Sequence, residues 1–244
     1  MGTLYFRLGE GAVTHRTTAG FPLRSELNSV KLAGMIPTTK GLREPRAPER
    51  QETRDLILDA AREMFVKEGI EAVTMRAIAK KVEFTPTAIY HHFRDKHALL
   101  RELCDNDMRA LAQAFQRIGK IEDPIDRLRR IGQTYIRFGL ENPSHYRFLF
   151  MTVTPPDVDT GVEKANPEED AYSFLRLTVA EAISAGRLRS ELTDPDQAAL
   201  MIWSVTHGIV SLSIVFDNDD WIAWPDPEKT GLAAVDSMIR GIVR

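Results

Sequence analysis

The 244-residue sequence predicts an all-α protein, with an N-terminal three-helix helix-turn-helix domain followed by a helical bundle. From about residue 53 onward, apolar residues recur at three- and four-residue spacing, which is the period of an amphipathic helix. Breakers that contain proline or glycine divide this pattern into segments of helical length. No segment alternates apolar and polar residues as a half-buried strand does.

The composition is that of a soluble globular protein, with 43 % hydrophobic and 27 % charged residues. Its single cysteine, Cys104, can form neither an internal disulfide nor a zinc site by itself. No apolar run approaches the roughly 18 residues of a membrane span, and the N-terminus lacks the apolar core of a secretory signal. We therefore expect a cytoplasmic protein without a membrane partner.

The net charge of −3 is unevenly distributed. Residues 1–48 carry seven Lys/Arg against three Asp/Glu, which leaves the rest of the chain at −7. Residues 74–97 still hold five Lys/Arg against Glu83 and Asp95. A basic face on an acidic body suits a module that binds phosphates. Residues 1–48 show no helical or strand period and are predicted to be a disordered arm, with a basic arm along DNA as the alternative.

The N-terminal helices follow from apolar spacing and end signals. The first is predicted from a Thr53 N-cap to a stop at Gly69. Thr74 caps a second helix that ends at Val82, and Thr85-Pro86 begins a third that ends at about Phe93. Lys96 begins a long fourth helix. The apolar positions of the first are Leu56, Ile57, Ala60, Ala61, Met64 and Phe65.

The C-terminal part keeps the helical period almost throughout. Breakers at Asn142-Pro143, Gly186 and Asp194-Pro195 separate its segments. The polar, proline-rich stretch 154–167 is predicted to be a mobile surface loop. Helices are expected at about 124–140, 143–152, 168–185, 195–216 and 228–243.

The second and third helices, joined by Glu83-Phe84-Thr85, have the form of a helix-turn-helix. Ile89 and Phe93 face inward and fix the roll of the third helix. Small residues at its start allow an approach to base edges, and donors along its flank hold phosphates. Its exposed face carries Thr87, Ala88, Tyr90, His91 and His92.

The runs 74–79 (TMRAIA) and 85–96 (TPTAIYHHFRDK) resemble the DNA-binding signature of the tetracycline-repressor (TetR) family. The preceding helix, with Ala60-Ala61, Phe65 and Gly69, is similar too, so the resemblance covers roughly residues 53–100. It implies a DNA-binding domain at 49–98 and a ligand-binding and dimerisation domain at 99–244. It also implies a homodimeric repressor, released from a palindromic double-stranded operator by a small-molecule effector that the sequence does not identify.

The resemblance assigns roles to individual residues. Phosphate contacts are implied for Thr74, Tyr90, His92 and Lys96, a base-edge contact for Arg76, and the major-groove face for Thr85, Thr87, Ala88 and His91. Taken singly, Tyr90 also fits an amphipathic surface residue, Lys96 a solvated charge and Arg76 an ion-pair partner. One departure is Glu83, which stands where the family's turn usually has glycine. A glutamate in a left-handed turn costs roughly 1 kcal/mol, so the turn is expected to differ in shape.

Neither a metal nor a catalytic site is expected. His91 and His92 point about 100° apart on a helix and so cannot readily share an ion. Ser204, His207 and Asp217 lack a nucleophile-elbow motif, and Asp105 beside Cys104 disfavours the thiolate. The sequence thus predicts no cofactor and no enzyme activity.

Aromatic residues are frequent in the C-terminal part. Most fit a core, but an aromatic cavity between helices also holds apolar ligands. The runs 142–148 and 203–208 resemble a TetR subgroup marked by a Trp–His–Gly pattern. In this interpretation His207 donates to a ligand, or it satisfies a buried polar neighbour. The pocket candidates are Tyr135, Phe138, Phe150, Phe174, Trp203 and His207.

The last two helices are predicted to form the dimer as a four-helix interface. Two alternatives remain for the whole protein: a helical adaptor that has lost DNA binding, supported by Glu83 alone, and a small-molecule enzyme in the helical domain. The interface residues expected are Ala198, Ala199, Ile202, Val205, Ile209, Leu212 and Val215 on one helix and Leu232, Val235, Ile239 and Ile242 on the other.

Overall fold

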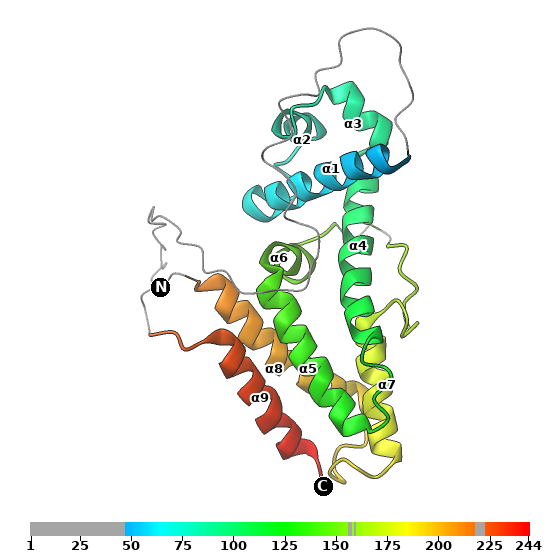
Figure 1. Cartoon of the computed structure of the whole chain (residues 1–244), viewed down its shortest axis with the longest axis vertical. Helices are drawn as coiled ribbons and strands as arrows, with labels where there is room; N and C mark the ends of the chain where they lie inside the picture. The colour runs from blue at the N-terminus through cyan, green and yellow to red at the C-terminus, as the bar shows by residue number, and fades with distance from the viewer. Residues whose placement is uncertain (1–46, 156–157, 159, 218–222) are drawn as a thin grey trace. The chain divides into compact units, whose positions relative to one another are not determined.

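The computed structural model describes residues 47–155, 158, 160–217 and 223–244. The regular elements of these residues are all helices, apart from one isolated antiparallel bridge between Leu188 and Val243, which confirms the predicted all-α class. The predicted arm lies outside the described residues up to position 46. The helices are α1 Ala47–Glu68, α2 Met75–Lys81, α3 Pro86–His92, α4 Lys96–Gln116, α5 Pro124–Glu141, α6 Pro143–Met151, α7 Ala171–Ser184, α8 Pro195–Val215 and α9 Pro227–Ile242 (Figure 1).

Two predicted helix starts are wrong. Thr53 does not cap α1 but lies inside it, where its hydroxyl donates to the Glu49 carbonyl at 2.9 Å. The first turns of α1 are polar on all sides, so apolar spacing could not reveal them. α7 begins at Ala171 rather than at 168, because the carboxylate of Asp170 caps it by accepting from the Tyr172 N–H at 2.9 Å.

Three helices of the C-terminal part share one start. α5, α8 and α9 each begin with aspartate followed by proline, and the aspartate accepts a backbone N–H of the first turn. The fixed φ of proline suits the first helical position, while the carboxylate satisfies a donor that has no partner within the helix. These starts are at Asp123, Asp194 and Asp226.

The described residues form two hydrophobic cores. The first joins α1, α2 and α3 to the N-terminal half of α4, and it also takes in Phe148 of α6, whose ring stacks on Phe65 at 6.3 Å. The second joins the C-terminal half of α4 to α5, α7, α8 and α9. α4 and α6 therefore belong to both halves of the protein and connect them mechanically.

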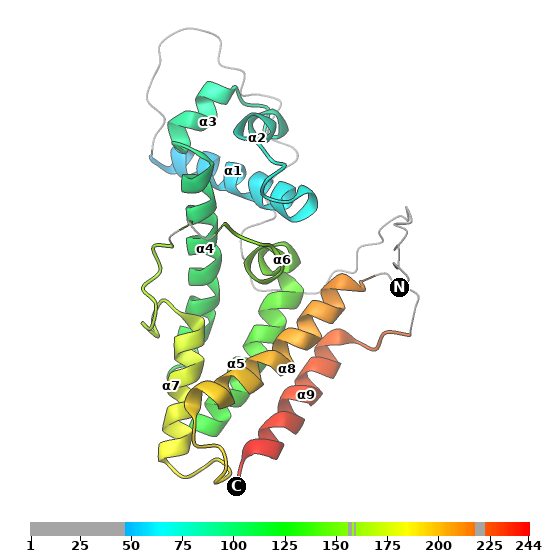
Figure 2. The same ribbon diagram turned by 180° about the vertical axis from the view of Figure 1, so that it is seen from behind.

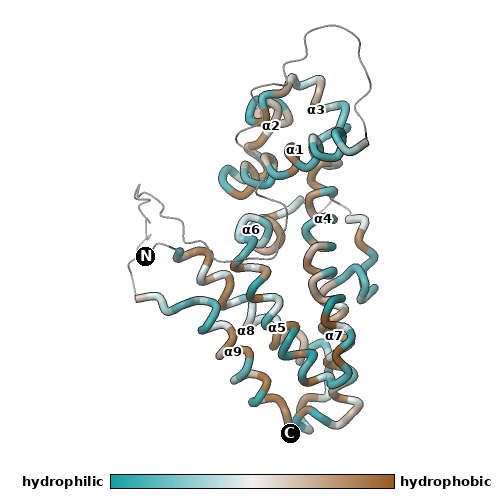
Figure 3. Tube along the Cα trace, in the orientation of Figure 1, coloured by the Kyte–Doolittle hydropathy of each residue, from teal (hydrophilic) through white to brown (hydrophobic). Residues whose placement is uncertain are grey.

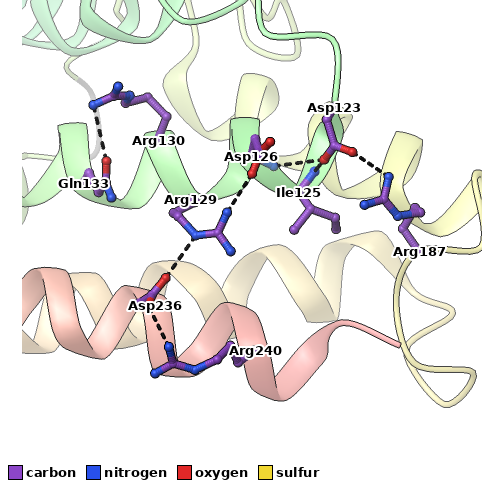
Figure 4. Close-up of polar contacts among 9 residues, drawn as sticks. All are labelled: Asp123, Ile125, Asp126, Arg129, Arg130, Gln133, Arg187, Asp236 and Arg240. Carbon is purple, nitrogen blue, oxygen red and sulfur yellow. Dashed lines mark hydrogen bonds and ion pairs between the residues drawn. The ribbon is translucent and has the colours of Figure 1, made fainter.

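Helices α5, α8 and α9 lie side by side in the second core (Figures 1 and 2). Close approach depends on glycine: a Cβ on Gly132 of α5 would lie 2.9 Å from both methyl groups of Val235 on α9. Ion pairs lie beside the packed contact between α5 and α9. Nε of Arg129 on α5 is 3.0 Å from Oδ1 of Asp236 on α9 (Figure 4). Such partly exposed pairs contribute little to stability, so packing holds the helices together.

Candidate nucleic-acid interface and internal cavity

The helix-turn-helix is built from two capped helices. Thr74 caps α2 by accepting the Ala77 N–H at 3.1 Å, and Thr85 caps α3 by accepting the Ala88 N–H at 3.2 Å. Each cap uses a hydroxyl oxygen as the acceptor, which leaves the hydroxyl proton available to donate outward. Both threonines are exposed, so these protons can reach a phosphate oxygen on a docked duplex.

The turn between α2 and α3 keeps a left-handed residue at Glu83, with φ of +59°. The expectation that glutamate changes the shape of this turn is therefore wrong. The Phe84 N–H donates to the Ala79 carbonyl at 2.9 Å, and Val82 and Ile89 pack into the shared core on either side. Core packing and the backbone bonds impose the conformation and offset its cost, which for a residue with a side chain is about 1 kcal/mol.

Replacing Glu83 with glycine is expected to raise the free energy of unfolding by about 1 kcal/mol, because glycine adopts positive φ without steric cost. Urea unfolding followed by circular dichroism measures this change. The control is Glu71→Gly, since Glu71 is equally exposed but has no positive φ. A loss of stability in Glu83→Gly, as in the control, would show that the turn carries no strain.

The residues assigned to DNA belong to α2, α3, the residues that cap them and the start of α4. Tyr90 is 51 % exposed although it is aromatic, and buried Ile89 beside it fixes the direction of the helix. Ala88 and Lys96 are half-buried. The exposed members are Thr74, Arg76, Thr85, Thr87, Tyr90 and His91.

His92 differs from the others because its ring is half-buried. Its Nδ1 is buried and has no hydrogen-bond partner among the described residues. Burial lowers the pKa of His92, and the positive charges of Arg54 and Arg50 lower it further. The imidazole is therefore neutral at neutral pH, which disfavours a charged contact between His92 and a phosphate.

Arg54 of α1 anchors the end of α3. Its role was not predicted from the sequence. Its guanidinium donates to the carbonyl of His92, the last residue of α3, and lies 4.4 Å from the ring centroid of Phe93. It also pairs with Glu102 of α4. One side chain thus ties α3 to both α1 and α4. No local pattern could reveal it, because its partners are 38 and 48 residues away.

A buried polar junction connects the helix-turn-helix to the rest of the protein. The carboxylate of Asp107 on α4, 1 % exposed, accepts two bonds from Arg62 of α1, at 2.9 and 2.8 Å. Its Oδ1 also lies 2.8 Å from Nδ1 of His145 on α6. Burial alone would lower the pKa of Arg62, but Asp107 and Asp59 reverse this and raise it. The junction joins three helices and was not predicted from the sequence.

A cavity of about 290 Å³ lies between α4, α5, α6, α7 and α8. Its walls are mainly aliphatic and aromatic, and Tyr135, Phe150 and Trp203 line it as predicted candidates. Tyr172 lines it too and was missed; its ring centroid lies 5.7 Å from that of Trp203. Such a concave, aromatic site between helices suits a small apolar molecule.

The other three pocket candidates do not line this cavity. Phe138 and Phe174 are buried in the core, because their positions on α5 and α7 point toward neighbouring helices. His207 lies behind the wall, where its Nδ1 is 2.6 Å from the hydroxyl of Tyr146. It satisfies a buried polar neighbour, the second of the two roles that the sequence left open.

The outer face of α8 is apolar and exposed. It carries Leu200, Met201, Val205, Leu212 and Val215, and Figure 3 shows hydrophobic stretches on both α8 and α9. Much of the predicted dimer interface is wrong, because many of the residues assigned to it face the core of the same chain. The misassigned residues are Ala198, Ala199, Ile202, Val235, Ile239 and Ile242.

α8 is also long and apolar enough to cross a membrane, by length and composition alone. This was not expected from the sequence, where no apolar run reached that length. The helix is apolar because its inner face packs against α5, α7 and α9 while its outer face carries the exposed residues. A core helix with a second apolar face meets the same test, so the finding is weak evidence for a membrane span.

Comparison with known proteins agrees with this architecture. The family model described as bacterial regulatory proteins of the tetR family matches residues 57–103, and the model of the tetracycline repressor-like C-terminal domain matches residues 128–227. The chain is 25 % identical over 193 residues to the HTH-type transcriptional regulator TtgR of Pseudomonas putida, covering 71 % of this chain and 90 % of that protein.

Solved structures share the fold. The ketosteroid transcriptional regulator KstR2 of Mycobacterium tuberculosis superimposes with a TM-score of 0.59 at 18 % identity, over 79 % of this chain and 95 % of that one. The SmeT–triclosan complex gives a TM-score of 0.59 at 22 % identity, over 80 % and 93 %. With both family models matched in order and the helix-turn-helix geometry in place, the chain belongs to the TetR family of DNA-binding transcriptional regulators.

Proposed function

We propose that this regulator binds a palindromic operator as a homodimer and is released from it by a small molecule in the cavity. The observation that carries the proposal is the combination of an exposed, capped α3 with a mainly apolar cavity, joined through α4 and α6. Blocking transcription by occupying an operator needs no further surface, so a repressor is the simplest form of this function.

The proposed DNA contacts follow from exposure and chemistry. Thr87 and His91, with half-buried Ala88, face the major groove and discriminate bases. Tyr90 and Lys96 hold phosphates on either side. The hydroxyl protons of Thr74 and Thr85 donate to further phosphate oxygens. Arg76 reaches a base edge. His92 acts by its backbone, whose carbonyl receives Arg54, rather than by a charged ring.

The proposed route of release is α6. This helix lines the cavity with Leu149 and Phe150, and its neighbouring residues His145 and Phe148 contact Asp107 of α4 and Phe65 of α1. A ligand that favours another position of α6 changes these contacts and hence the position of α3. The coupling between two such sites is typically about 1–3 kcal/mol.

The proposed dimer interface is the outer face of α8. Its exposed apolar side chains are large enough to form the centre of an interface, and a second copy of the chain offers the same surface in a two-fold arrangement. Two helix-turn-helix units about one DNA turn apart then match the two halves of a palindrome. A partner subunit that covers this apolar face also explains the apolar composition of α8 without a membrane.

The remaining sequence-based assignments are proposals of the same kind. We propose a DNA-binding domain at 49–98, a ligand-binding and dimerisation domain at 99–244, and a cytoplasmic location. We also propose the Trp–His–Gly subgroup, supported by the contacts of Trp203 and His207 with Tyr135. The adaptor alternative loses its support, because Glu83 keeps the turn in the left-handed conformation.

Fluorescence anisotropy tests DNA recognition. Purified protein is titrated against labelled DNA from its own upstream region and against random DNA, across a salt series. Lys96→Ala is expected to weaken all DNA similarly and to lower the slope of log K against log salt by about 1. Thr87→Ala is expected to alter sequence preference instead.

The control for these variants is Lys120→Ala, an exposed lysine after the end of α4. It removes the same charge away from the proposed interface and is expected to change the salt slope little. An equal loss of slope in Lys96→Ala and Lys120→Ala would show that the effect is general electrostatics. Equal, weak binding of the wild-type protein to both DNAs would contradict the operator proposed in the upstream region.

A further inference from the structure

Most residues that line the cavity are apolar. The charged ones are Lys164, Glu169 and Asp170, all in the segment before α7 and all exposed or half-buried. The carboxylate of Asp170 is occupied in capping α7. The rest of the lining carries no charged side chain, so an ion bound away from this segment would lose hydration without compensation.

The polar atoms of the interior largely satisfy one another. Trp203 donates its Nε1–H to the hydroxyl oxygen of Tyr135 at 2.9 Å. The hydroxyl of Tyr135 lies 3.1 Å from that of Tyr146, which in turn lies 2.6 Å from Nδ1 of His207. The hydroxyl of Thr206 donates to backbone carbonyls of α8.

The direction of this chain of hydrogen bonds depends on the protonation states and on the tautomer of His207. Burial lowers the pKa of His207, so its imidazole is neutral. Burial also raises the pKa of Tyr135 to about 12 and that of Tyr146 further, so both phenols keep their protons. In the tautomer that carries its proton on Nε2, Nδ1 of His207 accepts from Tyr146, and Tyr135 donates to Tyr146. The hydroxyl of Tyr135 also lies 3.3 Å from the same Nδ1, and in this arrangement its oxygen, which accepts from Trp203, retains one lone pair.

We propose that the cavity takes uncharged, largely apolar aromatic molecules with one hydroxyl or N–H group, which donates to the hydroxyl oxygen of Tyr135. The rings of Phe150, Tyr172 and Trp203 stack against the apolar part. The donor matches the lone pair that the hydroxyl oxygen of Tyr135 retains in this arrangement. This ligand class rests on the proposed effector function of the same cavity.

The test uses four probes that share one biphenyl body. Biphenyl-4-ol offers a donor, 4-methoxybiphenyl has the same oxygen without a proton, biphenyl-4-carboxylate is an anion and biphenyl-4-ylmethylammonium is a cation. Isothermal titration of the full chain is expected to give the tightest binding for biphenyl-4-ol. The expected advantage is about tenfold over the methoxy compound and about 100-fold over both ions.

Two variants locate the donor's partner. Tyr135→Phe is expected to abolish the advantage of biphenyl-4-ol over 4-methoxybiphenyl, while the affinity for the methoxy compound changes by less than about threefold. Tyr172→Phe removes a hydroxyl from another tyrosine of the same cavity and is expected to keep the advantage. Because each comparison is made between two probes on one protein, a change in its stability cancels.

The outcomes separate the ligand class from the effector function. Tighter binding of the carboxylate or the ammonium probe overturns the ligand class, as does an absence of binding by all four at their solubility limits. Retention of the donor advantage in Tyr135→Phe overturns the role of Tyr135. If biphenyl-4-ol binds in the expected order but leaves DNA affinity unchanged, the ligand class stands and the proposed release of DNA fails.

Discussion

Replacing Asp107 with alanine is expected to lower the free energy of unfolding by about 3–5 kcal/mol. The substitution leaves the guanidinium of Arg62 buried without its main counter-charge and removes the partner of His145. A buried unpaired charge is among the costliest defects that a single substitution produces. Urea unfolding measures the loss, and the same variant is expected to weaken DNA binding because α1 and α4 lose their junction.

Asp236→Ala provides the matched control. Asp236 also accepts from two arginines, Arg129 at 3.0 Å and Arg240 at 2.7 Å, but 42 % of its side chain is exposed (Figure 4). Its loss is expected to cost about 0–1 kcal/mol. Similar losses in the two variants would show that burial does not raise the value of the Asp107 junction.

A double variant keeps this prediction testable if Asp107→Ala fails to fold. Arg62→Met with Asp107→Leu replaces both charges by apolar groups, which at buried ion pairs is often neutral or stabilising. The double variant is therefore expected to be more stable than Asp107→Ala. If α6 transmits the signal through this junction, the double variant also binds DNA but responds less to a ligand. A full response would contradict the proposed route.

The second large effect is expected from Leu200→Glu combined with Leu212→Glu. The two leucines are 53 % and 50 % exposed on the outer face of α8, so the monomer should lose little stability. In the proposed dimer both are covered, and the loss at each central position is about 2 kcal/mol or more. Because a two-fold dimer contains each position twice, the four substituted side chains weaken dimerisation roughly 10⁵-fold or more, since 1.4 kcal/mol is a tenfold change. Sedimentation equilibrium measures it.

Leu177→Glu is the control for the dimer. Leu177 on α7 is 45 % exposed and becomes the same charged residue, but it lies outside the proposed interface. It is expected to leave both the dimer and palindrome binding intact. A double variant on α8 that stays dimeric, with unfolding unchanged, would place the interface elsewhere.

The sequence by itself determined the helices and the chemistry of the recognition face. Apolar spacing, Asp–Pro and Thr–Pro starts and glycine stops are local features, because a helix is built from contacts within a few residues. Thr74 and Thr85 could therefore be predicted as helix caps from neighbouring residues, whereas the DNA contacts of these residues and of Tyr90 came from the family resemblance and stay predictions. The two wrong helix starts also have local causes. The polar first turns of α1 carry no apolar period, and the N-cap of α7 is Asp170, so that helix begins later than predicted.

Only the tertiary structure decided which residues meet across the chain. Arg54 with Glu102, and Asp107 with Arg62 and His145, join residues 38 to 48 positions apart, and no sequence period encodes such pairs. The two faces of α8 are both apolar, so composition could not separate core from surface. Packing against α5, α7 and α9 made that choice, burying Ile202 and exposing Leu212. Packing also places His207 behind the cavity wall, beside the hydroxyl of Tyr146. It holds Glu83 in its left-handed turn, because burial of the surrounding apolar groups outweighs a local conformational cost of about 1 kcal/mol.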